Sequence, residues 1–147
     1  MYKFKELNYK TKGKYDFINI TPKVLKLIKE SGVRFGDANI QSLHTTCGLI
    51  VNENEDGLLK HDFIGLFERL SEKKLYYKHD DFKARYQNMC DGECKNGHSH
   101  CKAILLPVNV TLNIINGNLQ LGQWQQIFFV ELDRKRDRRV QILIQGE

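Results

Sequence analysis

The hydrophobic pattern at the start of the chain predicts two short strands and then a helix. Residues 3–9 and 14–20 are extended runs separated by a Thr-Lys-Gly turn, a pattern typical of a hairpin. Residues 24–28 then place apolar side chains on one stripe of a helix. Thr21 is the predicted helix cap, followed by a proline that suits the first helical position, and Gly32 can adopt the left-handed conformation that ends the helix.

The middle of the chain combines extended, helical and irregular patterns. Residues 38–52 predict two extended segments with a bend or bulge near Cys47 and the glycine after it. Residues 55–70 carry apolar side chains at helical spacing, with a charged opposite face. Residues 71–97 show no sustained period, and so long a loop in a compact domain is often functional. Residues 99–106 predict a short helix that a proline stops.

The last third of the chain is typical of strands. Residues 108–114 alternate between apolar and polar, Asn116-Gly117 supplies a hairpin turn, and residues 118–122 begin the return strand. Two further strands are expected at 125–132 and 138–145. Seven or eight strands and two or three helices that do not alternate regularly predict an α+β fold with a mostly antiparallel sheet, rather than a parallel doubly wound sheet.

Composition narrows the class of protein. A chain of 147 residues with 41% hydrophobic and 28% charged residues fits one globular domain, residues 1–147, and excludes a disordered or collagen-like protein. No apolar run approaches the roughly 18 residues that cross a membrane, and the N-terminus lacks a signal-peptide pattern. We therefore expect a cytoplasmic protein with no membrane partner, in which cysteines are free thiols or metal ligands rather than disulfides.

The positive charge is concentrated near the end of the chain. Lys and Arg outnumber Asp and Glu by 23 to 18, and residues 134–139 contain five of these basic side chains. This cluster is interpreted either as a solvated turn between two strands or as a patch that binds phosphate or nucleic acid. No nucleic-acid recognition motif accompanies it, so we expect no nucleic-acid partner.

Histidines are the first candidates for chemistry. His98 and His100 would point the same way from an extended backbone, whereas in a helix they would diverge by about 200°. Together with His44 from a distant strand they would form a three-histidine metal site with an open position for water or substrate. The alternative is that these histidines are structural and hydrogen-bonded. His61 lies on the charged flank of the predicted second helix and is expected to face solvent.

Cysteines and carboxylates offer further candidates. Cys90, Cys94 and Cys101 surround the histidine pair, either as ligands of a zinc ion or as reduced thiols in a loop. Residues 52–56 place three carboxylates between a strand and a helix, where they can cap the helix, bind Mg²⁺ or transfer protons. No nucleophile elbow or Walker loop is present.

Two residues near the last strands have distinct expectations. Trp124 precedes an apolar run and is interpreted as core or subunit-interface packing, with a substrate platform as the alternative. Glu131 lies in an apolar strand, and if its side chain points inward it requires a partner such as Arg138 or a metal, because an unpaired buried carboxylate is costly.

Several separated motifs resemble one family. Residues 44–49 (HTTCGL), 52–56 (NENED), 77–80 (YKHD), 97–100 (GHSH), 117–129 (GNLQLGQWQQIFF) and 138–147 occur in the order typical of the YjbQ-like family, also called the secondary thiamine-phosphate synthase family. The resemblance runs nearly end to end. The chain departs from the family pattern at Gln123, where threonine is usual, at Asn109, where serine is usual, and in the insertion that contains Cys90 and Cys94.

The resemblance implies a compact α+β fold, a homotrimer with sites near subunit boundaries, and a synthase activity. That activity joins a pyrimidine pyrophosphate to a thiazole phosphate and releases pyrophosphate, so a small phosphorylated metabolite is the expected partner and a divalent metal, Zn or Mg, the expected cofactor. The expected catalytic residues are His44, Glu53, Asp56 and His79, and the expected metal ligands are His44, His98 and His100. Substrate contacts are expected from Thr45, Thr46, Asn52, Lys102, Trp124 and Arg139.

Two rival functions stay open at this point. The first keeps the metal and histidine site but makes the protein a hydrolase in which bound water is the nucleophile. The second is a trimeric protein that binds a metal or a phosphorylated metabolite without turnover. Synthase activity differs from both because it requires two substrates together.

Overall fold

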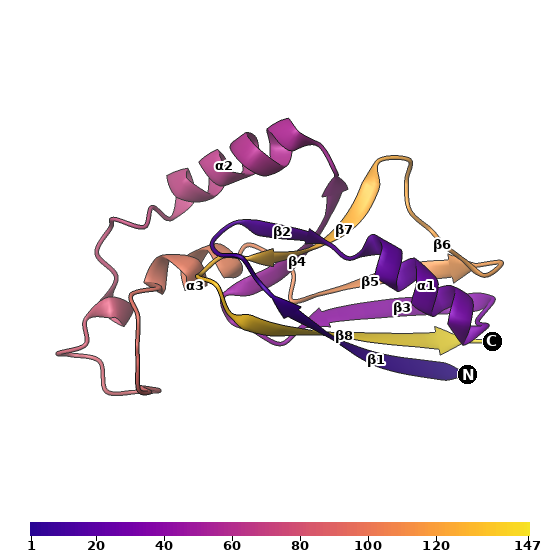
Figure 1. Ribbon diagram of the computed structural model, residues 1–147, viewed down its shortest axis with the longest axis horizontal. Helices are drawn as coiled ribbons and strands as arrows, with labels where there is room; N and C mark the ends of the chain where they lie inside the picture. The colour runs from indigo at the N-terminus through magenta and orange to yellow at the C-terminus, as the bar shows by residue number, and fades with distance from the viewer.

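The computed structural model describes residues 1–147 as two antiparallel sheets with three α-helices (Figure 1). The five-stranded sheet has the order β1-β8-β3-β5-β6, and the three-stranded sheet has the order β2-β7-β4. The strands are β1 (Tyr2–Lys10), β2 (Asp16–Asn19), β3 (Phe35–Ser42), β4 (Cys47–Glu53), β5 (Asn109–Ile115), β6 (Asn118–Leu119), β7 (Gln125–Glu131) and β8 (Asp137–Gly146). The α+β prediction with antiparallel pairing is confirmed.

Three α-helices and two short helical turns connect the strands. The α-helices are α1 (Thr21–Ser31), α2 (Phe63–Leu70) and α3 (Gly97–Ala103); a π-helical turn spans Leu58–Asp62, and a 3₁₀ turn spans Lys78–Asp80. None of these helices combines the length and apolar character needed to span a membrane.

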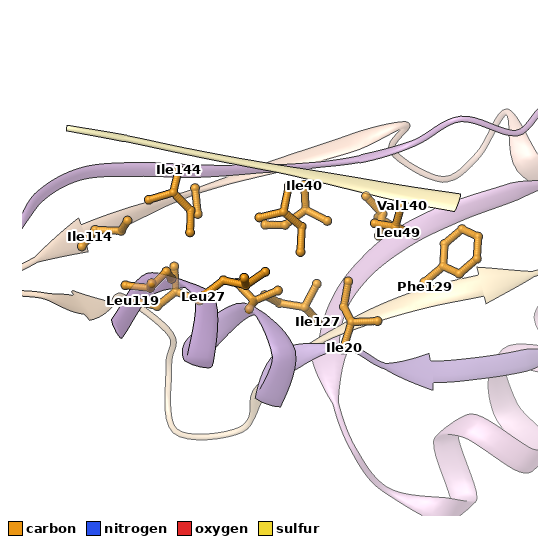
Figure 2. Packing of buried hydrophobic residues seen from close by; sticks show 14 of the residues in the cluster. Ile20, Leu27, Ile40, Leu49, Ile114, Leu119, Ile127, Phe129, Val140 and Ile144 are labelled. Atoms are coloured by element: carbon orange, nitrogen blue, oxygen red, sulfur yellow. The ribbon is translucent and has the colours of Figure 1, made fainter. Parts of the chain in front are cut away.

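The main core lies between the five-stranded sheet, the three-stranded sheet and α1. Figure 2 shows Ile40 of β3 and Ile144 of β8 on one side of this core, facing Leu27 of α1 and Ile127 of β7. All four side chains are buried. The period-2 burial along β8 follows from this arrangement, because only one face of the five-stranded sheet packs on the core.

Strand β7 is buried on both faces. Ile127 and Phe129 face the main core, while Phe128 and Val130 join a second cluster with Phe67 of α2. A strand covered on both sides has a continuous apolar sequence rather than an alternating one. The uninterrupted apolar run of β7, residues 127–130, fits this rule. Because β7 pairs with both β2 and β4, it is the centre of the smaller sheet.

The predicted opening hairpin is wrong. Strand β1 pairs with β8 in the larger sheet, whereas β2 pairs with β7 in the smaller one. The capping prediction at α1 also requires correction: the Asn19 side chain accepts the Thr21 N–H at 3.0 Å, and the Thr21 hydroxyl instead accepts the Ile127 N–H at 2.8 Å. Gly32 ends α1 at φ +75°, as predicted.

Other element predictions are confirmed with shifted boundaries. The second helical region begins at Asp56, where the Glu55 carboxylate accepts the N–H groups of Gly57 and Leu58 at 2.8 and 2.9 Å. The break between β3 and β4 falls at 43–46, slightly before the predicted bend. Asn116 and Gly117 both have positive φ, 52° and 76°, the backbone of a type I′ hairpin turn.

The long segment 71–96 is organised by one guanidinium group. Arg85 donates to the backbone carbonyl oxygens of Gln87, His79 and Asn88 at 3.1, 3.0 and 2.9 Å, and it lies 3.3 Å from the Glu93 carboxylate. The segment therefore has a defined path although it has no hydrophobic period and only one 3₁₀ turn.

A glycine substitution tests the close approach of β3 and β8. A Cβ at Gly36 would lie 2.0 Å from the backbone oxygen of Gln145, which cannot move without breaking the sheet register. Gly36→Ala is expected to lower the free energy of unfolding by about 1–3 kcal/mol in urea denaturation. Gly65→Ala in α2 is the matched control, since its nearest neighbour is the flexible Arg69 side chain and alanine favours helix. Equal stability of the two variants would contradict the expectation.

Candidate functional site

A cavity of about 510 Å³ opens where the connections between strands meet segment 71–96. Its walls come from the β3–β4 connection, from residues 79–96, from α3 and from the β7–β8 connection. Its cationic and imidazole side chains are His44, His79, His100, Arg85, Arg134, Arg136 and Arg138, against the two carboxylates of Asp91 and Glu93. Among the side chains that line the cavity, hydrogen-bond donors and positive charges therefore outnumber carboxylates.

A buried ion pair lies beneath this cavity. Arg138 donates two hydrogen bonds to Glu131, from Nε at 2.6 Å and from a terminal nitrogen at 2.8 Å, and both side chains are almost fully buried. Arg138 also donates to the Thr46 hydroxyl at 2.8 Å. Burial, the largest single influence, would raise the pKa of Glu131, but the hydrogen bonds from Arg138, the Asp133 N–H and Thr11, together with the Arg138 charge, lower it overall. The expectation that Glu131 pairs with Arg138 is confirmed.

Asp133 holds two further arginines at the cavity. Its carboxylate accepts from Arg134 at 3.0 Å and from Arg136 at 3.5 Å, and its side chain is 5% exposed. It also accepts a hydrogen bond from the Asn96 amide at 3.1 Å. The basic cluster at 134–139 is therefore not simply a solvated turn, because three of its arginines line one cavity.

His44 presents an N–H group rather than a free lone pair. Its Nε2 accepts the backbone N–H of Arg139 at 2.8 Å. A neutral imidazole that accepts at Nε2 carries its proton on Nδ1, so the remaining nitrogen can only donate. Burial, assisted by the charges of Arg138 and Arg139, lowers the pKa of His44 and favours this neutral form.

His79 and His100 lie side by side, with ring centroids 4.5 Å apart. Arg85 lies 3.1 Å from the Nε2 of His79, and because a guanidinium can only donate, His79 accepts there. Burial, together with the neighbouring His79, lowers the pKa of His100. His44, His79 and His100 thus line one cavity.

His98 does not join this group. Residues 97–103 form helix α3, so His98 and His100 diverge instead of pointing the same way. His98 is 3% exposed, and its Nδ1 lies 3.1 Å from the Lys102 ammonium. Burial and the Lys102 charge lower the pKa of His98 to about 4.

The residues do not fit the expected metal site. The predicted grouping of His44, His98 and His100 is not formed, and no cluster of three or more His, Cys, Asp or Glu side chains is arranged to hold a metal ion. The hydrogen bonds explain why, since the acceptor nitrogens of His44, His79 and His98 are already used by N–H groups of the protein. Cys90 and Cys94 line the cavity as free thiols, and Cys101 is exposed on α3.

Lys102, expected at the substrate, lies in an internal network. Its side chain is fully buried and donates to Glu68 at 3.2 Å, and Glu68 also accepts from Lys14 at 2.7 Å and from the Tyr15 hydroxyl. Burial alone would raise the pKa of Glu68, but the three hydrogen bonds lower it to about 2. This network of Lys14, Tyr15, Glu68, His98 and Lys102 links α2 and α3 to the β1–β2 connection.

The remaining predicted residues separate into two regions. Thr45 and Thr46 line the cavity, where Thr46 accepts from Arg138. The Arg139 side chain is more than half exposed and lies 3.7 Å from Glu6, so only its backbone N–H reaches His44.

The acidic segment and the tryptophan lie at the far end of β4. Glu53 pairs with Gln125 in the strand register, at the opposite end of β4 from Thr46, a separation of about 20 Å at the usual strand rise. Asn52 and Trp124 share that end, and Asp56 forms an exposed pair with Lys60. Trp124 is 65% exposed, so it does not pack in the core of its own chain, and that half of the interpretation is wrong. One chain therefore does not bring these residues to the cavity.

Sequence reasoning missed several residues of the cavity. Asn96, Asp133 and Arg85 each fix part of its wall through the hydrogen bonds described above. The length of residues 71–97 and their lack of a period, which are typical of a loop that is often functional, are the sequence signal that covers Arg85 and Asn96.

Breaking the buried pair should be costly. Glu131→Gln leaves the Arg138 charge without its carboxylate, and we expect a loss of about 3–5 kcal/mol in the free energy of unfolding. Asp56→Asn, which removes one partner of the exposed Asp56–Lys60 pair, should have little effect. A small loss in Glu131→Gln, measured by the same denaturation, would show that the pair contributes little.

His98 should make stability depend on pH. Its pKa is about 4 in the folded chain, below the ordinary histidine value of 6.5, so as the pH falls below 6.5 the unfolded chain binds the proton first. The free energy of unfolding should fall between pH 6.5 and pH 4, by up to about 3 kcal/mol from this group. His98→Asn should remove that part of the slope, while His61→Asn, an exposed control, should keep it. An unchanged slope in His98→Asn would contradict the assignment.

Comparison with known proteins places the whole chain in one family. Residues 5–147 match the family model described as UPF0047 protein YjbQ-like. A UPF0047 protein of Methanothermobacter thermautotrophicus is 36% identical over 142 residues, covering 97% of this chain and 91% of the relative. YugU of Bacillus subtilis is 31% identical over 142 residues, covering 97% and 98%.

Solved structures agree with these sequence matches. A crystal structure from Sulfolobus solfataricus matches with a TM-score of 0.88 and 28% identity, covering 100% of this chain and 99% of the other. A YjbQ/UPF0047 structure from Clostridium acetobutylicum matches with a TM-score of 0.81 and 36% identity, covering 96% and 99%. With the motifs, the fold and the matches in agreement, the chain belongs to the UPF0047 family of YjbQ-like proteins.

Proposed function

We propose that the protein binds a small phosphorylated metabolite in the cavity between His44 and the arginines of the β7–β8 connection. The observation that carries this proposal is the convergence of Arg134, Arg136 and Arg138 on one cavity, each oriented by a buried carboxylate. Guanidinium groups recognise phosphate through charge-assisted hydrogen bonds. A volume of about 510 Å³ is that of a small-molecule site.

On this basis we propose a transferase of the thiamine-phosphate synthase type. In that reaction a C–O bond of the pyrimidine pyrophosphate breaks, pyrophosphate leaves with the electron pair, and the thiazole nitrogen forms the new C–N bond. The main requirement is stabilisation of the charge that develops on the leaving group. The arginines and the His44 N–H are donors of the right kind for this role. The resemblance to the family supplies the choice of substrates.

We also propose a homotrimer in which a neighbouring subunit approaches the cavity. Trp124 is exposed beside Asn52 and Glu53 at the end of β4 remote from the cavity, so these family-motif residues would act at another subunit's site. The mass of the protein in solution, measured by analytical ultracentrifugation, checks this point; a monomer would exclude shared sites.

A charge-matched pair of variants tests the binding site. Arg136→Ala removes a cavity arginine, while Lys135→Ala removes an equal charge from the neighbouring exposed residue, which does not line the cavity. Arg136→Ala should weaken pyrophosphate binding about 10- to 100-fold, because a hydrogen bond to a charged group is worth about 1.5–3 kcal/mol. Lys135→Ala should stay within about twofold in isothermal titration calorimetry. Equal losses of affinity in both variants would indicate attraction by the overall positive charge of the surface instead of a specific site.

The reaction is tested by supplying the two substrates separately and together. Thiamine phosphate and pyrophosphate that form only with both substrates, and are lost in Arg136→Ala, support the transferase. Phosphate or pyrophosphate released from one substrate alone would indicate a hydrolase. Saturable binding with no product would indicate a binding protein without turnover.

A further inference from the structure

Asn96 lies at the wall of the cavity with its backbone fully fixed. Its N–H donates to the Asp80 carboxylate at 3.0 Å, and its carbonyl oxygen accepts the N–H groups of Ser99 and His100 at 2.9 and 3.3 Å. The residue is 8% exposed and lines the cavity together with His100 and Arg134. Its side chain therefore has little freedom to move away from this position.

The orientation of the Asn96 amide is also fixed. Its Nδ2 donates to the Asp133 carboxylate at 3.1 Å. A flipped amide would place Oδ1 against that carboxylate, where two acceptors repel each other. Asp133 itself is held by Arg134 and Arg136, so it cannot turn away to accommodate a flip.

This orientation leaves a buried acceptor without a donor. Across the whole chain, only two buried side-chain atoms lack a hydrogen-bond partner, Asn96 Oδ1 and the Tyr9 hydroxyl, and Tyr9 does not line this cavity. Buried polar atoms are nearly always paired, because leaving one unpaired is costly. Because Asn96 lines the cavity, a ligand bound there can supply the missing donor.

We propose that Asn96 Oδ1 accepts a hydrogen bond from an O–H or N–H group of the ligand, and that it selects phosphorylated compounds that carry such a donor. This inference rests on the proposed function, since the arginines bind the phosphate end. The arginines donate hydrogen bonds and Asn96 Oδ1 accepts one, so they contact different groups of one ligand.

A matched pair of small phosphates tests this selection. 2-Hydroxyethyl phosphate and propyl phosphate have the same charge and the same number of non-hydrogen atoms, and they differ only in a terminal hydroxyl or methyl group. The wild-type protein should bind 2-hydroxyethyl phosphate roughly tenfold more tightly than propyl phosphate, because the site rejects an analogue that leaves its polar group unpaired. Titrations followed by amide NMR shifts measure both dissociation constants.

Asn96→Ala should abolish the preference without destroying the cavity. Asp133 keeps Arg134 and Arg136 in this variant, so propyl phosphate should bind as it does to the wild type, while the two dissociation constants become equal within about twofold. Asn88→Gly is the control, since Asn88 lines the same cavity, makes no side-chain hydrogen bond, and has the positive φ that glycine adopts freely. It should keep the preference.

The outcomes separate the two proposals. Equal binding of both phosphates to the wild type would overturn the role of Asn96 and leave phosphate binding intact. A preference that survives in Asn96→Ala would also overturn it, because another group would then contact the hydroxyl. Binding of neither phosphate would overturn the proposed phosphate site, and the role of Asn96 with it.

Discussion

The bidentate ion pair between Glu131 and Arg138 is the interaction on which this architecture depends. Glu131 is the last residue of β7 in the smaller sheet and Arg138 is the second residue of β8 in the larger one, so the pair joins the sheets where they diverge. Glu131 also accepts from Thr11 and from the Asp133 N–H, at 2.9 and 3.0 Å. A buried carboxylate is tolerated only when its oxygens are satisfied, so the chain around it must keep this arrangement.

The same pair sets the chemistry of the cavity. Apolar residues could join the two sheets with similar stability, but they would leave the cavity without the Arg138 cation and the Thr46 contact. Asp133, two residues after Glu131, holds Arg134 and Arg136 in the same way, through a buried carboxylate. Buried acids therefore hold the arginines in place before any ligand binds, which reduces the entropy lost on binding. The structural and functional roles of these charges cannot be separated.

Local patterns were sufficient for much of the fold, and pairing between distant segments was not. The left-handed end of α1 at Gly32, the Asn116–Gly117 turn and the alternation in β5 depend on neighbouring residues, and the sequence predicted them. The partners of β1 and β2 lie more than 100 residues away, so the local pattern wrongly predicted a hairpin. The predicted grouping of His44, His98 and His100 failed because the helix predicted at 99–106 begins two residues earlier, at Gly97, whose N–H donates to Asp80 outside the helix. His98 and His100 therefore both lie in α3 and diverge.

The walls of the cavity differ in how they are held. His44, Thr46 and Arg138 belong to strands or their immediate ends, whereas segment 71–96 is braced internally by Arg85, which donates to three backbone carbonyl oxygens besides its contacts with the His79 and Glu93 side chains. Backbone acceptors do not depend on side-chain identity, so residues between them can change without loss of the path. Cys90 and Cys94 line the cavity from this segment. The side chains of this wall, and with them the contacts that the cavity offers, can therefore change while both sheets stay the same.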